Sequence, residues 1–271
     1  LIAETSWGKS SYGITLADLN LKSGKGVLIV STEDSESIYG NRLMARRAKV
    51  NARRLRDHSL YPDELDAVAD TAAAAEDAPV YLDARGKNIE AIIPQVAELI
   101  ERQGIQLVIF DYLQEMRAAK RYQDERTKFK DIASQCRCVI KDHNITGIIM
   151  SQLTPKDGKR PDKYSVKESK DVADGAEVIL VGFYLQEEAF IKSTNTTIPK
   201  GEKVIRIDKA KDGEKGLAWM RWNGNQATFE EVCKGDREDD WQDEADREAA
   251  RAADEYGEFD EGNKLYGGNY G

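Results

Sequence analysis

The sequence predicts an α/β fold with a mainly parallel central sheet, followed by an antiparallel extension toward the C-terminus. Short apolar, β-branched runs recur up to about residue 185, at 26–32, 79–83, 106–111, 147–151 and 177–183. These runs lack strict polar alternation, which is typical of strands that are buried on both faces. Segments with helical spacing separate them, at 35–48, 89–102 and 124–143. Strands that alternate with helices form βαβ units, and such units give a parallel sheet.

The pattern changes after residue 200, where short strands follow one another without helices. An Asp-Gly pair at 212–213 and an Asn-Gly pair at 223–224 are both strong hairpin-turn signals. They divide three apolar segments, at 203–208, 216–222 and 227–232. We therefore expect antiparallel hairpins that extend the parallel sheet.

The charge of the chain is unevenly distributed. The 271 residues carry a net charge of -9, but 234–271 alone holds five Lys or Arg against thirteen Asp or Glu. This segment then becomes rich in Gly, Asn and Tyr, so we expect an acidic, mostly disordered tail with at most a short helix over 239–254. We expect one folded domain over 1–233. Its nearly balanced charge does not exclude nucleic acid, because binding needs only a local basic surface.

The rarer residue types exclude several kinds of chemistry. Three cysteines without metal-ligand spacing and two histidines favour neither a disulfide framework nor a zinc site. No run approaches the ~20 apolar residues of a membrane helix, and the start of the chain lacks the pattern of a signal peptide. We expect a cytoplasmic, reducing location. Residues 1–3 read as the end of a strand, so we also expect further sequence upstream in the intact protein.

Residues 3–10 read Ala-x-x-x-x-Gly-Lys-Ser, between an expected strand and an expected helix. This is the setting of a phosphate-binding loop, whose backbone N–H groups and helix N-terminus cradle phosphate oxygens. Lys9 would reach the β- and γ-phosphates of ATP, and Ser10 would offer its hydroxyl to Mg²⁺. We expect the nucleotide contacts of the loop from Ser6, Trp7, Gly8, Lys9, Ser10 and Ser11. Ala3 stands where the pattern usually has glycine, and a chance Gly-Lys-Ser at a helix start is the alternative.

Polar side chains end three further apolar strands. Asp111 would hold Mg²⁺ through water, Glu33 would polarise the attacking water, and Gln152 would contact the γ-phosphate. Each alone has an ordinary explanation as a strand-end or helix-opening residue. Together with the phosphate loop they predict one ATP-hydrolysing site, because the carboxyl ends of parallel strands meet at the same edge of a sheet.

Basic residues cluster in segments that follow these strand ends. We expect contacts with nucleic-acid phosphates from Arg117, Lys120, Arg121, Lys159, Arg160 and Lys163. Solvated loop charge is the alternative. Two more lysines, Lys209 and Lys211, end a later strand, where they could reach a nucleotide held by a neighbouring subunit. Ordinary edge-strand lysines are the alternative for this pair.

Over residues 1–232 the chain resembles the DnaB-type replicative helicases, which have a RecA-like P-loop NTPase core. The resemblance rests on ordered motifs, namely AETSWGKSS, VLIVSTED, NRLMARRAKVNARRLRD, VIFDYLQEMR, SQL, VKESKDVADGAEVIL and DKAKDGEKG. It implies the following roles: ATP–Mg²⁺ binding by Lys9 and Ser10, catalytic base for Glu33, Walker B acid for Asp111, γ-phosphate sensor for Gln152 and a place beside the adenine for Arg42. The loops after Asp111 and Gln152 would hold single-stranded DNA in a central channel.

The resemblance also implies a hexameric ring that hydrolyses ATP at its subunit interfaces, moves along single-stranded DNA and unwinds duplex. Partners implied in this way are a primase, a loader or a polymerase. The family usually carries Lys-x-Arg where this chain has Lys209-Ala210-Lys211, so lysine stands at the arginine-finger position and cannot fork onto phosphate oxygens. Two other functions stay open: a recombinase-type or regulatory DNA-binding ATPase that does not unwind duplex, and a nucleotide-binding scaffold without catalysis.

Overall fold

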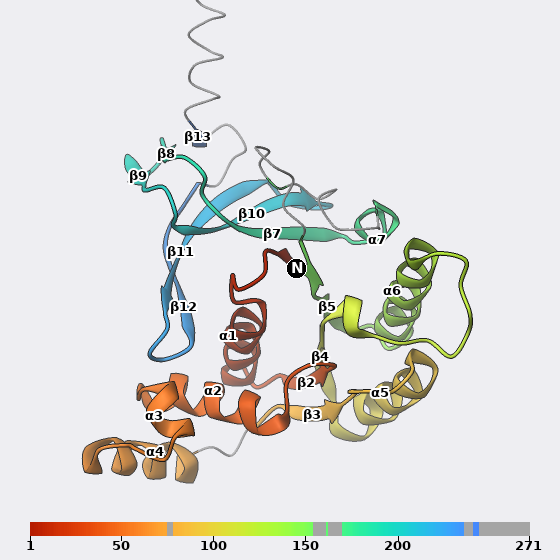
Figure 1. Ribbon diagram of the computed structural model, residues 1–271, viewed down its shortest axis with the longest axis horizontal. Coiled ribbons are helices and arrows are strands. Elements are labelled where there is room, and N and C mark those ends of the chain that lie inside the picture. The colour runs from red at the N-terminus through yellow and green to blue at the C-terminus, as the bar shows by residue number, and fades with distance from the viewer. Residues whose placement is uncertain (75–77, 154–160, 162–169, 236–240, 244–271) are drawn as a thin grey trace, which may run out of the picture.

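The computed structural model describes residues 1–74, 78–153, 161, 170–235 and 241–243 (Figure 1). Lys159, Arg160, Lys163 and most of the expected acidic tail lie outside these residues. Four parallel strands form one sheet, in the order β3 (Val80–Asp83), β2 (Gly26–Ser31), β4 (Ile105–Asp111) and β5 (Thr146–Ile149). The predicted parallel sheet is therefore confirmed.

A second sheet contains six strands, in the order β12 (Thr228–Gly235), β11 (Gly216–Asn223), β10 (Lys203–Ala210), β7 (Val178–Tyr184), β1 (Ile2–Ala3) and β6 (Ser151–Gln152). Strand β1 is parallel to both of its neighbours, whereas β10, β11 and β12 are antiparallel. The two sheets adjoin at Met150, which alone separates β5 from β6. Its N–H donates to the Phe110 carbonyl at 2.9 Å, and the next N–H, that of Ser151, donates to the Leu1 carbonyl at 2.9 Å.

Helices cover both faces of the parallel strands (Figure 1). On one face pack α5 (Ile89–Gln103) and α6 (Glu125–Asp142), and on the other α1 (Lys9–Lys22) and α2 (Glu36–Ala48). Successive side chains of a strand point to opposite faces. Accordingly Leu28 and Val30 join the core under α5 and α6, while Val27 and Ile29 join the core under α1 and α2.

Local sequence explains where the long helices begin and end. Helix α6 begins after Asp124, whose carboxylate accepts from the Thr127 N–H at 2.7 Å, a typical N-cap. Helix α5 ends before Gly104, which adopts a φ of 62° and so supplies the left-handed cap that most side chains avoid. The remaining helices are α3 (Ala52–Arg56), α4 (Pro62–Ala74), the 3₁₀ turn η1 (Leu113–Glu115) and α7 (Lys170–Asp174).

The antiparallel extension is confirmed, with β10 two residues longer than the sequence indicated. A further small sheet has the order β13 (Trp241–Asp243), β8 (Ala189–Ile191) and β9 (Thr196–Ile198). The short helix expected over 239–254 is wrong for the three residues of β13, because their backbone pairs with the edge strand β8. No helix in the described ranges is both long and apolar enough to cross a membrane.

Candidate active site

The loop between β1 and α1 has the backbone geometry of a phosphate-binding loop. Ser6 and Gly8 adopt positive φ angles of 62° and 110°, and Gly8 is the N-cap of the 14-residue helix α1. Where residues with positive φ alternate with residues of negative φ, the N–H groups of successive residues point toward one concave surface. Lys9 and Ser10 are half-buried in the first turn, and Ser11 is buried beneath them.

Trp7 lies in this loop, but its side chain points away from it. The indole is completely buried, stacks on Phe229 with ring centroids 4.8 Å apart, and donates from Nε1 to the Phe183 carbonyl at 3.2 Å. Trp7 can therefore contact a nucleotide only through its backbone. Its side chain instead fixes the loop to the antiparallel extension.

Lys9, Glu33 and Asp111 face the same space. Asp111 pairs in register with Ser31 of the adjacent strand β2, and Glu33 follows two residues later. Burial lowers the pKa of Lys9, while the charges of Asp111 and Glu33 act in the opposite direction. Burial also raises the pKa of Glu33, as do several neighbouring carboxylates, including Asp111. Thr32, which precedes Glu33, donates from Oγ1 to the Asp111 carbonyl at 3.0 Å, and Lys9 Nζ lies 5.7 Å from the ring centroid of Tyr112, the residue after Asp111. These contacts bring the three side chains together at the carboxyl edge of the sheet.

Asp111 has one occupied and one unoccupied carboxylate oxygen. Its Oδ2 accepts a hydrogen bond from the Tyr39 hydroxyl, whereas its buried Oδ1 has no hydrogen-bond partner among the described residues. Burial and the adjoining Asp111 raise the pKa of Tyr39, and a hydrogen bond with Ser10 opposes this. Ser10 and Asp111 thus meet at one tyrosine hydroxyl.

This arrangement suits a hydrated Mg²⁺ held jointly with a nucleotide. Mg²⁺ in nucleotide sites usually takes one or two protein oxygens and completes its shell with phosphates and water. A free, buried carboxylate oxygen beside a serine hydroxyl provides that set. No group of three or more His, Cys, Asp or Glu side chains suited to a metal occurs in the described part of the chain, so a site built by protein ligands alone is not present there.

Gln152 lies beside the phosphate loop. Strand β6 pairs with β1, so that Gln152 is opposite Ala3, and its Nε2 donates to the Thr5 hydroxyl at 2.6 Å. Gln114, which the sequence did not single out, holds this strand end. Its Nε2 donates to the Ser151 hydroxyl at 2.8 Å, and its Oε1 accepts from the Gln152 N–H at 3.0 Å. The segments that contain Asp111 and Gln152 are therefore joined by one side chain.

A family model described as the DnaB-like helicase C terminal domain matches residues 1–231. The chain belongs to the DnaB-like helicase family. Among curated relatives is a probable plasmid replicative DNA helicase of Chlamydia psittaci, 24% identical over 235 residues, which are 84% of this chain and 50% of the relative. Another is the replicative DNA helicase DnaC of Bacillus subtilis, 23% identical over 221 residues, which are 79% of this chain and 48% of the relative. The chain spans about half the length of these relatives.

Two solved structures share the fold of this DnaB-like domain. One, of a DnaB-like replicative helicase described with its primase interactions, has a TM-score of 0.71 at 18% identity and covers 84% of this chain and 55% of the other. The second, the ATPase domain of G40P, has a TM-score of 0.70 at 16% identity and covers 84% of this chain and 82% of the other. The predicted RecA-like P-loop NTPase fold is confirmed.

Other predicted site residues of the DnaB-like domain lie on α2 and in the segment after η1. Arg42 donates to Asp34 at 2.7 Å and is half-buried on α2. Arg117, Lys120 and Arg121 are exposed in the segment after η1. Lys120 lies over the Tyr122 ring, 5.2 Å from its centroid, and carboxylates of Glu90 and Asp131 bond to the same segment, at the Ala119 N–H and the Tyr122 hydroxyl.

Lys209 and Lys211 lie at the opposite end of the sheet from Lys9. Strand β10 is antiparallel to β7, and its last residue, Ala210, pairs with Val178, the first residue of β7. Lys209 Nζ donates to the Asp174 carbonyl at 2.9 Å, and the exposed Lys211 donates its N–H to the Glu177 carbonyl at 3.0 Å. Neither lysine belongs to the site formed by its own chain.

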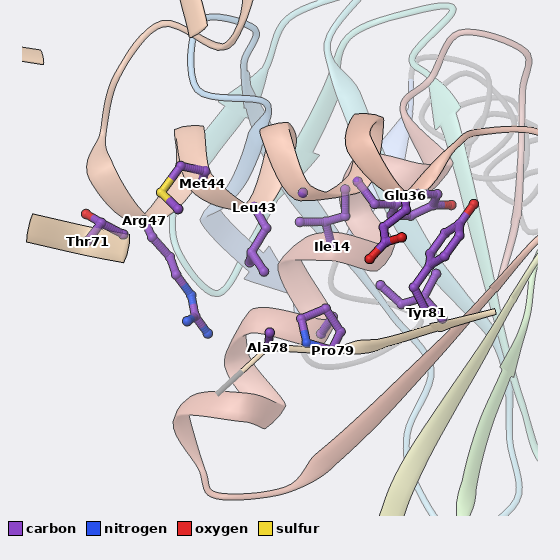
Figure 2. Close-up of a pocket in the computed structure, with 13 residues that line it drawn as sticks. Ile14, Glu36, Leu43, Met44, Arg47, Thr71, Ala78, Pro79 and Tyr81 are labelled. Carbon is purple, nitrogen blue, oxygen red and sulfur yellow. The ribbon is translucent and has the colours of Figure 1, made fainter. Parts of the chain in front are cut away.

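An apolar cavity of about 220 Å³ lies between α1, α2 and the segment that enters β3 (Figure 2). Ile14, Leu43 and Met44 are among the side chains that line it. Tyr39 also lines it and separates it from Asp111. Neither Lys9 nor Asp111 lines the cavity, so it is distinct from the phosphate site.

Proposed function

We propose that this chain is the ATP-hydrolysing motor of a replicative DNA helicase. In this proposal it binds ATP and Mg²⁺, works at the subunit interfaces of a hexameric ring, moves along single-stranded DNA and unwinds duplex. The observation that carries the proposal is the convergence of Lys9, Glu33 and Asp111 on one edge of the sheet, with Gln152 beside the loop.

Each of these side chains suits one part of ATP hydrolysis. The N–H groups of the loop and the charge of Lys9 hold the phosphates. Asp111, through its free Oδ1, and Ser10 hold Mg²⁺, which neutralises phosphate charge when it is bound. Glu33 is exposed and so has access to water, and its raised pKa makes it a stronger base than an ordinary glutamate.

The position of Lys211 supports hydrolysis between subunits. A cation at the far end of β10 cannot reach the phosphates held by its own Lys9, because at least four residues of strand and the whole loop intervene. It remains free to serve a nucleotide bound by a neighbouring subunit. Such a trans cation stabilises the charge that develops on the transferring phosphoryl group.

The exposed basic residues after η1 suit DNA. Arg117, Lys120 and Arg121 lie in the segment that follows β4 and η1, where they are accessible to a phosphate backbone. We assign them, together with the basic residues at 159, 160 and 163, to single-stranded DNA. A primase, a loader or a polymerase would be further partners of the assembled ring.

Two substitutions test the core of the proposal. Lys9→Ala should abolish ATP hydrolysis without unfolding the chain, because Lys9 is a half-buried polar residue in the first turn of α1 and its loss opens no cavity in the apolar core. Glu33→Gln should keep nucleotide affinity and hydrolyse ATP ~10²–10⁴-fold more slowly, as expected for loss of a general base. ATP turnover with and without single-stranded DNA, together with strand displacement, gives the readout.

A matched control replaces an exposed acid elsewhere, as in Glu98→Gln, and should leave turnover unchanged. Near-normal turnover in Lys9→Ala would refute the site. DNA-stimulated ATP hydrolysis without strand displacement, combined with filaments rather than rings in electron micrographs of the intact protein, would refute the helicase function.

A further inference from the structure

Lys203, the first residue of β10, lies against the phosphate loop although it is almost two hundred residues away in sequence. Its Nζ donates to the Trp7 carbonyl at 2.6 Å. It also lies 3.8 Å from the position that a Cβ would take at Gly8. The ammonium group is therefore a direct neighbour of the loop, on the side of its carbonyl groups.

Three aromatic rings surround this ammonium group. It lies 5.4 Å from the centroid of Tyr184, 4.9 Å from that of Trp222 and 5.4 Å from that of Phe229. Distances of this size allow cation–π attraction, which grows as water is removed. Burial accordingly lowers the pKa of Lys203. No acidic side chain in the described ranges forms an ion pair with it, so carboxylates there do not compete for its hydrogen-bond donors.

Tyr184 makes the companion contact one residue earlier in the loop. Its hydroxyl donates to the Ser6 carbonyl at 3.0 Å, and its ring is one of the three around Lys203. Two donors from the end of β7 and the start of β10 therefore hold two successive carbonyls of the loop. A peptide unit whose carbonyl is held on one side directs the N–H of the next residue to the other side. The Trp7 carbonyl held by Lys203 therefore turns the Gly8 N–H toward the concave side, where the phosphates would lie. The Trp7 N–H, which follows the Ser6 carbonyl, donates to the Glu4 carbonyl at 3.2 Å and closes the turn of the loop.

We propose that Lys203 and Tyr184 are positioning residues that clamp the carbonyl side of the phosphate loop, so that Lys203 keeps the Gly8 N–H turned toward bound phosphates and Tyr184 fixes the turn that precedes it. The inference rests on the proposed nucleotide site at Lys9 and deepens it. The clamp gives the antiparallel extension a direct part in nucleotide affinity. It acts beside the buried Trp7 ring, which anchors the same loop through packing.

Nucleotide affinity of the full chain measures the clamp. Lys203→Met keeps the length of the side chain and removes the donor, and should raise the Kd for Mg-ADP about tenfold, since hydrogen bonds from charged groups are of that strength. Tyr184→Phe keeps the ring and should raise the Kd about threefold, as expected for a neutral hydrogen bond. Lys203→Arg keeps a donor and should stay within about twofold of the wild type.

The control is Lys200→Met, which removes the same charge from an exposed position three residues earlier and should leave the Kd unchanged. Thermal unfolding is measured in parallel for every variant. A lower melting temperature with an unchanged Kd in Lys203→Met would mean that the residue only stabilises the fold, and would overturn the clamp. An equal loss of Mg-ADP affinity in Lys203→Met and Lys203→Arg would also overturn the clamp.

Two further results separate this inference from the proposed function. Unchanged Mg-ADP affinity in Lys9→Ala would overturn the nucleotide site itself, whatever the behaviour of Lys203. Lost affinity in Lys9→Ala with full affinity in both Lys203→Met and Tyr184→Phe would leave the site standing and overturn only the clamp. Tyr184→Phe removes a single hydroxyl from a half-exposed ring, so it keeps the test decisive if Lys203→Met fails to fold.

Discussion

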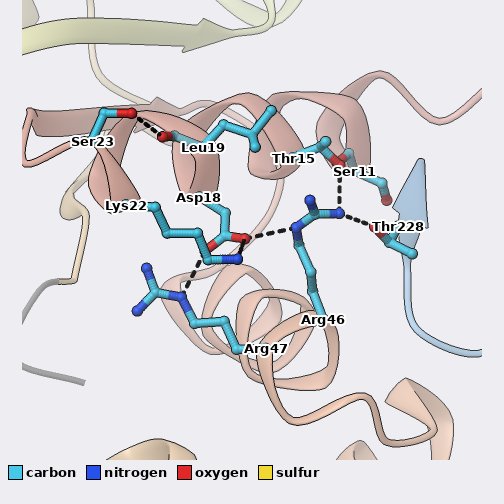
Figure 3. A network of polar contacts seen from close by, with 9 residues as sticks. All are labelled: Ser11, Thr15, Asp18, Leu19, Lys22, Ser23, Arg46, Arg47 and Thr228. Atoms are coloured by element: carbon cyan, nitrogen blue, oxygen red, sulfur yellow. Dashed lines mark hydrogen bonds and ion pairs between the residues drawn. The ribbon is translucent and has the colours of Figure 1, made fainter. Parts of the chain in front are cut away.

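Replacement of Asp18 by asparagine should destabilise the whole domain, because this carboxylate joins the helix of the phosphate loop to its neighbour. Asp18 lies on α1 with a completely buried side chain. Its Oδ2 accepts from Lys22 at 2.8 Å and from Arg46 at 2.9 Å, and its Oδ1 accepts from Arg47 at 2.7 Å (Figure 3). Arg46 also donates to Thr228, so the cluster reaches β12 of the antiparallel extension.

The burial of each partner sets the expected magnitude. The Lys22 side chain is 58% exposed, so its pair with Asp18 is screened and contributes little. The side chains of Arg46 and Arg47 are only 15% and 12% exposed, and both would lose a buried anionic partner in Asp18→Asn. Breaking a buried pair from one side costs about 3–5 kcal/mol. For a domain of this size the melting temperature should fall by roughly 6–20 °C.

At acidic pH most of the difference in stability between the wild type and Asp18→Asn should disappear. Burial alone would raise the pKa of Asp18, but hydrogen bonds from Lys22, Arg47 and Arg46 outweigh it, and the pKa lies below its ordinary value of 3.8. A group whose pKa is lower in the folded state stabilises fully above its unfolded pKa and loses that contribution as the pH falls through its folded pKa. The advantage of the wild type over Asp18→Asn should therefore be constant near neutral pH and shrink below about pH 4.

Thermal and urea unfolding, followed by circular dichroism at several pH values, provide the assay. Glu98→Gln is the matched control, since it makes the same chemical change in the Glu98–Arg102 pair, whose side chains are 60% and 68% exposed. Glu98→Gln should lower the free energy of unfolding by at most about 1 kcal/mol. A loss in Asp18→Asn no larger than in Glu98→Gln, or a difference that does not depend on pH, would refute the reasoning.

Three further predictions concern the site and its packing. Gln114→Ala should lower DNA-stimulated ATP turnover about 5- to 10-fold at nearly unchanged Mg-ADP affinity, because two hydrogen bonds that hold the end of β6 are lost; unchanged turnover would contradict it. Lys211→Ala should lower turnover by about 10²-fold, and mixing it with Lys9→Ala subunits should restore part of the activity in rings shown to co-assemble; no recovery would count against the trans role. Gly182→Ala should destabilise the domain by about 1–3 kcal/mol in urea unfolding, since the new Cβ would lie 2.8 Å from the Trp7 indole. Gly40→Ala is the control, because its new Cβ would have no neighbour within 4 Å, and it should not destabilise the domain.

The arrangement of the parallel sheet could be predicted because its causes are local. A strand buried on both faces is mostly apolar, and polar residues at its C-terminal end mark the edge of the sheet. Asp111 and Gln152 were predicted in this way, and both lie at the end of a strand. Their convergence then followed from the parallel direction of the strands.

No comparable local sequence pattern indicates the direction in which a side chain in a loop points. Trp7 lies between exposed Ser6 and the glycine of the phosphate loop, so the sequence alone favoured contact with the nucleotide. Its actual position depends on Phe229 and on the carbonyl of Phe183, which are distant in the chain. Tyr39 and Gln114 were missed for the same reason, since each acts through a partner on another strand.

The lysines of β10 illustrate this limit most clearly. Lys203, Lys209 and Lys211 belong to one short segment, and the sequence drew attention only to the last two. Which of them is close to Lys9 depends on the direction of β10 relative to β1, and hairpin signals do not fix that direction. Because β10 runs antiparallel to β7, and β7 parallel to β1, the beginning of β10 lies beside the phosphate loop and its end lies at the far edge. Lys203 therefore donates a hydrogen bond to the loop of its own chain, whereas in our proposal Lys211 acts on the nucleotide of a neighbouring subunit.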